Sequence, residues 1–369
     1  MRKTTALPAG PESVTPDGDL APASASASAS DAVIPGAGPA PRPGERATVR
    51  LRAGAPEQPP SRHTPEEPLS RHAPEKPPSR HAPEEPSRFV PEEPSRYAPE
   101  WLRLREAADA AARATELLGP LRTRLADRAD PHGGLVVHDL GCGTGSMGRW
   151  LAPRLDGAQH WILHDRDPYL LHFAAVGAAG AAADGSRITV ETRRGDVARL
   201  TPDALAGASL VTASALLDVL TREEVAALAA ACAGAGCPAL LTLSVVGRVE
   251  LTPADPLDAE LTEAFNAHQR RTGLLGPDAV TAAREAFAAH GADVRVCPSP
   301  WRLGPDQREL TAQWLRGWVA AAVEQRPELR GRADHYLAER LEACAAGELR
   351  VVVHHSDLLA LPGPTGGDA

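Results

Sequence analysis

From residue 134 onward, short apolar runs alternate with amphipathic stretches of helical spacing. Each apolar run is the length of a buried strand, and each amphipathic stretch is long enough for a helix. Repeated strand–helix units predict an α/β fold with a parallel, doubly wound sheet and right-handed crossovers. The expected strands are residues 135–140, 160–164, 188–192, 209–214, 240–246, 292–297 and 349–355.

Helical spacing also precedes and interrupts this series. Apolar residues over 101–118 predict a helix that Gly119-Pro120 would end. Two helices broken at Gly276-Pro277 are expected over 257–290, and a helical insert over about 306–346.

Residues 1–97 show neither pattern and are rich in Pro, Ala and Ser. Such a stretch buries too little apolar surface to offset chain entropy, so we expect a disordered tail before a folded domain at 98–369. This stretch contains a short repeat of the form Ser-Arg-z-x-Pro-Glu, in which z is His, Phe or Tyr. The copies start at Ser61, Ser70, Ser79, Ser87 and Ser95. We interpret the repeats as a solvated tether; the alternative is an array that docks a protein partner.

Charge and composition narrow the class of protein. The net charge of −9 argues against non-specific nucleic-acid binding, and no apolar run is long enough for a membrane span. The five cysteines lack CxxC spacing, so neither a disulfide framework nor a zinc site is expected. His354 and His355 are adjacent on an expected strand and point to opposite faces, so we expect no metal there either. These features predict a cytoplasmic protein.

The strongest local signal is a strand that ends in Asp139 and runs into a glycine-rich turn, Gly141-Cys142-Gly143-Thr144-Gly145. Glycines let the backbone turn tightly and approach a ligand, and the following helix N-terminus offers amide donors. Residues 143–148 also match the GxGxxG dinucleotide pattern, which is weak evidence by itself.

The register that includes Asp139 resembles motif I of the class I S-adenosylmethionine (SAM) dependent methyltransferases. The resemblance implies a Rossmann-like, seven-stranded sheet of order 3-2-1-4-5-7-6, with strand seven antiparallel, and SAM as cofactor. It also implies that Asp139 anchors the loop, that Asp165 binds the ribose and that Asp196 lies near the adenine. The cofactor-binding residues implied in this way are Asp139, Gly141, Cys142, Gly143, Thr144, Gly145, Asp165, Arg166, Asp196 and Val197.

Helix capping or turn chemistry is the alternative for Asp165 and Asp196. The chain also departs from the family pattern in two places. The strand over 210–214 lacks the carboxylate often found there, and about fifty residues separate the last two strands.

For the methyl acceptor the sequence favours a small molecule, because motifs typical of nucleic-acid methyltransferases are missing after strand four. Asp218 follows that strand and is a candidate catalytic residue, or else a carboxylate at a helix start. His268 shares a helical face with Leu261 and Phe265, so it is a candidate base, or else a core histidine. Further candidates for the acceptor pocket are Arg248, Glu250, Arg270, Arg271, Trp301, Arg302, Trp314 and Trp318.

The sequence therefore predicts a SAM-dependent methyltransferase. Two alternatives remain open at this point: a non-catalytic scaffold that docks partners through the repeats, and an NAD-dependent oxidoreductase.

Overall fold

The structure is a computed structural model that describes residues 98–126, 134–195 and 200–363. The expected tail with its repeats, as well as Asp196 and Val197, lies outside these residues. The strands are β1 (Leu135–Leu140), β2 (Gln159–Asp165), β3 (Ile188–Arg194), β4 (Leu210–Ser214), β5 (Ala239–Thr252), β6 (Asp293–Pro298), β7 (Trp301–Leu303) and β8 (Arg350–Leu361). The helices are α1 (Pro99–Ala112), α2 (Leu118–Ala126), α3 (Ser146–Leu151), α4 (Pro168–Val176), α5 (Arg222–Gly234), α6 (Leu257–Gln269), α7 (Ala279–Ala289), α8 (Arg308–Gln325) and α9 (Arg330–Ala346).

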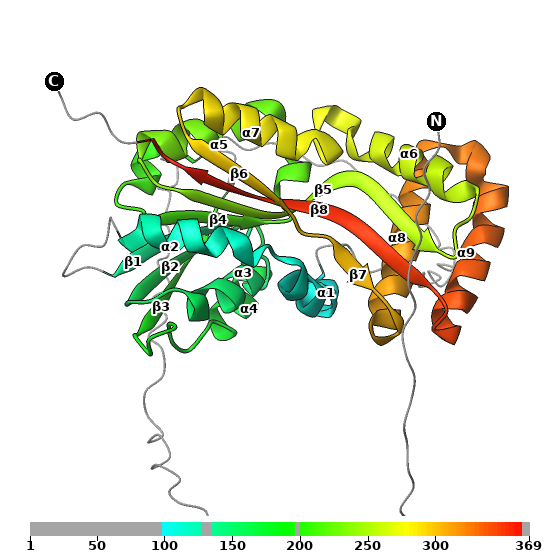
Figure 1. Cartoon of the computed structure of the whole chain (residues 1–369), viewed down its shortest axis with the longest axis horizontal. Helices are drawn as coiled ribbons and strands as arrows, with labels where there is room; N and C mark the ends of the chain where they lie inside the picture. Colours follow the sequence, from blue (N-terminus) through cyan, green and yellow to red (C-terminus); the bar gives the residue numbers. More distant parts are fainter. Residues whose placement is uncertain (1–97, 127–133, 196–199, 364–369) are drawn as a thin grey trace, which may run out of the picture. The chain divides into compact units, whose positions relative to one another are not determined.

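The strands form one sheet of order β3-β2-β1-β4-β5-β8-β6, and β7 pairs with β8 outside this path (Figure 1). The first five strands are mutually parallel, while β8 runs antiparallel to both β5 and β6. This is the order that the family resemblance implies, with β8 as the antiparallel seventh strand. The short strand β7 is an addition that the sequence pattern did not predict.

Helices cover both faces of the sheet, because its parallel strands are apolar on both sides. One core cluster joins α2, α3 and α4 to alternate residues of the sheet, such as Val137 and Trp161. A second cluster joins α5 and α7 to the opposite face, at Leu140 and Val211. A third lies where β5 and β8 extend beyond the other strands and pack with α6, α8 and α9.

The helical region at the start of the domain differs from the prediction. Helix α1 ends at Ala112, and α2 runs through Gly119-Pro120 instead of being stopped there. Proline is tolerated in a first helical turn, where its missing N–H has no partner to lose. The real break lies at Arg113, whose backbone leaves the helical region at φ −55° and ψ 133°.

A buried carboxylate fixes the segment after this break. Asp357 on β8 accepts hydrogen bonds from the backbone N–H of Ala114 and of Leu243, both at 2.8 Å. Leu243 has a left-handed φ of +58° and lies within an irregularity of the β5–β8 pairing. Asp357 thus ties together the chain after α1, the irregular part of β5 and β8.

Two histidines stack inside the sheet beside the loop that follows β1. His138 on β1 and His164 on β2 are both buried, with Nδ1 of the first 3.1 Å from Nε2 of the second. Burial, together with Arg193, lowers the pKa of His138 to about 4, and burial lowers the pKa of His164 to about 4 as well. Both imidazoles are therefore neutral in the folded protein at neutral pH.

Acid should destabilise the fold through this pair. Both folded-state pKa values lie below the unfolded value, so the unfolded chain binds more protons and stability falls as pH drops from about 6.5 towards 4. We expect each histidine to cost about 2 kcal/mol of unfolding free energy between about pH 7 and pH 5. Urea unfolding of His138→Gln at several pH values should show a shallower pH dependence than the parent. The exposed His335 gives the matched control, His335→Gln, which should keep the parent's slope.

The glycine turn after β1 requires its glycines for backbone reasons. Gly141, Gly143 and Gly145 all have left-handed φ values, of +59°, +54° and +85°. A Cβ added at Gly141 would lie 2.9 Å from Leu216 Cδ1, and one at Gly145 would lie 3.1 Å from Ala174 Cα. The turn is therefore both strained for other residues and closely packed.

Gly141→Ala should lower the unfolding free energy by about 1–2 kcal/mol, because an L-residue is disfavoured at positive φ. Chemical denaturation measures this change. Gly180 has open space around it, so Gly180→Ala should stay within about 0.5 kcal/mol of the parent. Equal effects of the two variants would contradict the conformational argument.

Candidate functional site

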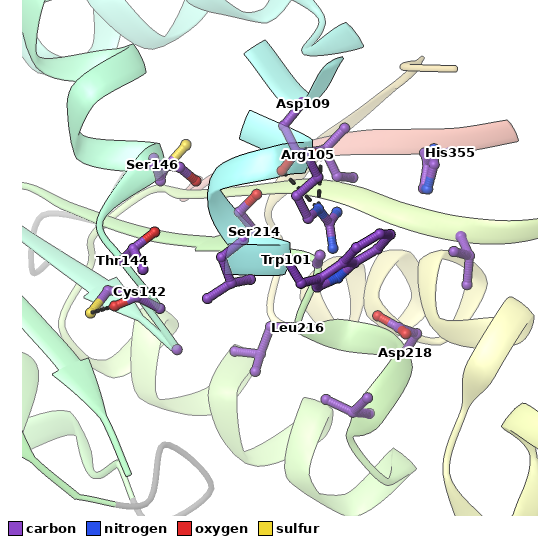
Figure 2. A pocket seen from close by; sticks show the side chains of 18 of the residues that line it. Trp101, Arg105, Asp109, Cys142, Thr144, Ser146, Ser214, Leu216, Asp218 and His355 are labelled. Atoms are coloured by element: carbon purple, nitrogen blue, oxygen red, sulfur yellow. Dashed lines mark hydrogen bonds and ion pairs between the residues drawn. The ribbon is translucent and has the colours of Figure 1, made fainter. Parts of the chain in front are cut away.

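A cavity of about 600 Å³ opens at the carboxyl ends of β1, β2 and β4 (Figure 2). Its volume lies within the range of roughly 300–1,000 Å³ found for small-molecule sites. In an open α/β sheet, this edge is where the strand order reverses and where ligands bind. The cavity is lined by the glycine turn and by aromatic residues from α1, α6, β7 and α8.

Asp165, at the end of β2, is bound directly to the glycine turn and lines the cavity beside it. Its Oδ2 accepts a hydrogen bond from the Gly143 N–H at 3.0 Å, and its Oδ1 accepts one from the Asp167 N–H at 2.9 Å. Each carboxylate oxygen has a second lone pair that these bonds leave available. Asp165 can therefore hold the loop and still accept two hydroxyl donors from a ligand.

Asp139, at the end of β1, is completely buried yet belongs to the cavity wall. Its Oδ1 accepts a hydrogen bond from the Thr212 hydroxyl at 2.8 Å, while its buried Oδ2 has no partner among the described residues. Burial raises the pKa of Asp139 to about 7, against the opposing effects of Thr212 and Arg113. A cationic group in the cavity would stabilise the ionised form of Asp139 and so offset the cost of its desolvation.

Arg113, at the break after α1, brings a buried positive charge to the same edge. Its Nη2 donates to the hydroxyls of Ser146 at 3.3 Å and Ser214 at 3.1 Å, and both serines line the cavity. Its Nε and Nη1 are buried without partners among the described residues. Burial lowers the pKa of Arg113, whereas Asp109 and Asp357 oppose this effect. At the end of β4, where the family often has a carboxylate, this chain thus has a serine bound to an arginine.

Helix α1 forms a wall of the cavity through Trp101, Leu102, Arg105 and Asp109 (Figure 2). Two interactions fasten this helix. Glu106 forms a bidentate ion pair with Arg149 of α3, with both N···O distances at 2.7 Å. Arg149 also donates to the carbonyl of Thr144 in the glycine turn.

The second fastening is Asp109, which is buried and accepts a hydrogen bond from the indole N–H of Trp301 at 2.9 Å. Arg105, one turn earlier, pairs with the same carboxylate at 3.0 Å and stacks over the Trp301 ring. Helix α1 is therefore linked both to the glycine turn and to Trp301.

The structure brings most of the predicted site residues to this one cavity. Gly145 does not line it and packs instead beneath the turn, near Ala174. The predicted residues that do line it are Asp139, Gly141, Cys142, Gly143, Thr144, Asp165, Arg166 and Asp218.

His268 does not join them. Its Nε2 lies 3.1 Å from Glu324 Oε2 on α8, and Arg271 contacts the same ring. Helix α6 does touch the cavity through Phe265, but His268 lies almost one turn later, where the helix faces α8. Of the three residues expected on one face, Leu261 is in the core, Phe265 lines the cavity, and His268 lies beside Glu324 and does not line the cavity.

The further candidates divide in the same way. Trp301 and Trp314 line the cavity, whereas Trp318 stacks on Trp314 and is buried in the third core cluster. None of the charged candidates lines the cavity: Arg302 is exposed, and the others form pairs elsewhere. These pairs are Arg270–Asp278, Arg271–Glu324 and Arg248–Glu250.

Sequence reasoning missed Trp101, Arg105, Arg113 and His355 as site residues. The first three come from the α1 segment, which carries no motif, and their placement depends on contacts more than a hundred residues away, such as Arg113 to Ser214. The sequence pattern around His355 suggests only a metal ligand as its alternative role. In the part of the chain that the structure describes, no group of three or more His, Cys, Asp or Glu side chains could hold a metal ion.

None of the five cysteines forms a disulfide. Burial raises the pKa of Cys142 well above its usual value, which makes this loop residue a poor nucleophile.

No helix of the described segments is long and apolar enough to cross a membrane.

Comparison with known proteins gives matches among solved structures only. No protein-family model and no curated protein match the chain. A cyclopropane synthase of Mycobacterium tuberculosis is 14% identical, with 66% of this chain and 83% of that chain covered and a TM-score of 0.35. A SAM-dependent methyltransferase of Thiobacillus denitrificans, solved with S-adenosylhomocysteine, is 18% identical over 72% and 98% of the two chains, with a TM-score of 0.35.

A phosphoethanolamine N-methyltransferase of Haemonchus contortus, solved with SAM, is 14% identical, with a TM-score of 0.37. This chain spans 58% of that protein, and 73% of this chain is covered. Matches this distant assign no activity to the chain. The fold is therefore assigned from the strand order and the glycine turn of the chain's own structure. The strand order with its antiparallel β8, and the glycine turn after β1, show that this chain has the fold of the class I SAM-dependent methyltransferases.

Proposed function

We propose that this protein is a SAM-dependent methyltransferase that transfers the sulfonium methyl group to a small-molecule acceptor. One observation carries the proposal: the carboxylates of Asp139 and Asp165 and the glycine turn between them line a single cavity at the switch point of the sheet. A nucleoside bearing a cationic amino-acid chain offers matching groups, namely two hydroxyls, an ammonium and a carboxylate.

The residues present fit such a molecule. Asp165 has lone pairs left for the two ribose hydroxyls, and the left-handed glycines bring the backbone close to the methionyl part. The unpartnered Oδ2 of Asp139 would complement the ammonium or the sulfonium charge. Arg113, held by two lining serines, would supply positive charge for the carboxylate. The adenine-side roles of Asp196 and Val197 remain predictions from the resemblance.

When bound, SAM supplies both the methyl group and its leaving group. The protein then has to align the acceptor and keep water away, which can contribute about 7–11 kcal/mol to lowering the barrier. Helix α1 suits this role, because it closes the cavity between the glycine turn and Trp301. Asp218, on the wall after β4, stays the proposed acceptor-side carboxylate. His268 is not part of the proposal.

Asp165→Ala should weaken SAM binding by ~10- to 100-fold, from the loss of hydrogen bonds to a charged acceptor. Isothermal titration calorimetry of the full chain with SAM measures this effect. Asp334, exposed on α9, gives the matched control: Asp334→Ala should bind SAM as the parent does.

A parallel titration with NAD separates the proposal from an oxidoreductase. We expect binding of SAM and none of NAD by the parent protein. Tight NAD binding without SAM binding would overturn the proposed function, and an unchanged SAM affinity in Asp165→Ala would remove that residue from the site.

A further inference from the structure

One part of the cavity wall is an aromatic chamber that belongs to the third core cluster. We use this name for the space lined by Trp101, Phe265, Trp301 and Trp314, with Val245, Val249 and Val353 between them. These residues come from α1, α6, β7, α8, β5 and β8. Indole and phenyl rings with intervening valines form flat apolar walls, which suit a flat apolar ligand.

The charges on the α1 side of this chamber are already neutralised by each other. Arg105 pairs with Asp109 at 3.0 Å and stacks over the Trp301 ring at 4.9 Å from its centroid. Asp109 is also bound to the Trp301 indole N–H. This charge pair therefore builds the wall and does not offer an unpaired ion to the ligand.

His355 on β8 is the exception among the polar groups of the chamber. It is 5% exposed and lines the cavity, and its Nδ1 is buried without a hydrogen-bonding partner among the described residues. Because Nδ1 is shielded from the cavity, the nitrogen that a ligand can reach is Nε2. Its ring packs against Trp301 with the centroids 5.3 Å apart. Figure 2 shows the imidazole projecting from β8 into the space that Trp101 and Arg105 also border.

The surroundings keep this imidazole neutral. Burial, with the nearby Arg105 guanidinium, lowers the pKa of His355 to about 3. A neutral imidazole has one nitrogen that accepts a hydrogen bond. The accessible Nε2 can therefore accept a hydrogen bond from a donor on a ligand when Nδ1 carries the ring proton.

We propose that the methyl acceptor is a flat, largely apolar molecule with one hydroxyl or N–H group, and that this group donates a hydrogen bond to His355. The inference rests on the proposed function, because it identifies the acceptor's place in the same cavity. His355 acts here as an anchor that orients the acceptor, and it determines which acceptors bind.

A pair of probes tests this anchor on the protein saturated with S-adenosylhomocysteine. The first probe, 2-naphthol, is flat and apolar and has one hydroxyl; the second, 2-methoxynaphthalene, has the same rings but no donor. Calorimetry should show that the parent prefers 2-naphthol by ~10-fold, the effect of one hydrogen bond to a buried acceptor. His355→Leu should abolish that preference while leaving the affinity for S-adenosylhomocysteine unchanged.

A second variant guards against a general disturbance of the chamber. His355→Gln retains a hydrogen-bond acceptor, so it should keep part of the preference for 2-naphthol. An equal preference in the parent and in His355→Leu would overturn the anchor, and failure of both probes to bind would overturn the flat apolar acceptor. Failure of the parent to bind S-adenosylhomocysteine would instead overturn the proposed function, and this inference with it.

Discussion

The site depends most on a single buried carboxylate, that of Asp357. Two backbone N–H groups, from Ala114 and Leu243, donate to it at 2.8 Å each. Burial raises the pKa of Asp357, while these hydrogen bonds and Arg113 lower it. The carboxylate thereby holds three separate segments at the carboxyl edge of the sheet.

Each of the three segments contributes to the cavity. The chain at Ala114 follows directly after Arg113 and α1, so its position sets where the guanidinium and the aromatic wall lie. The irregular part of β5 turns Leu243 and Val245 towards the cavity. Strand β8 carries His355 two residues before Asp357. The buried Asp357 carboxylate thus fixes the relative positions of three segments that no local sequence motif connects.

The difference between local motifs and long-range contacts explains which features could be predicted from the sequence. The turn from Asp139 to Gly145 is local, and its left-handed glycines and first-strand position are properties of neighbouring residues. The strand order followed from that motif and from the repeated strand–helix pattern, and the structure confirms it. The aromatic chamber could not be predicted, because its residues come from six elements that meet only through tertiary packing. His268 failed for the same reason: helical spacing gives the face of a helix but not where along that face the cavity ends.

The sequence distance across the Asp357 interaction has a consequence for how the protein is made. Ala114 and Asp357 are 243 residues apart in the sequence. Strand β8, which carries Asp357, lies between β5 and β6 in the sheet. Contacts so distant in sequence close late, since chain entropy must be overcome before they form. On the ribosome, the β1 to β5 part can assemble early, whereas the cavity cannot close until residue 357 has emerged. Nascent chains halted before β8 should therefore expose unpaired edges of β5 and β6 to chaperones.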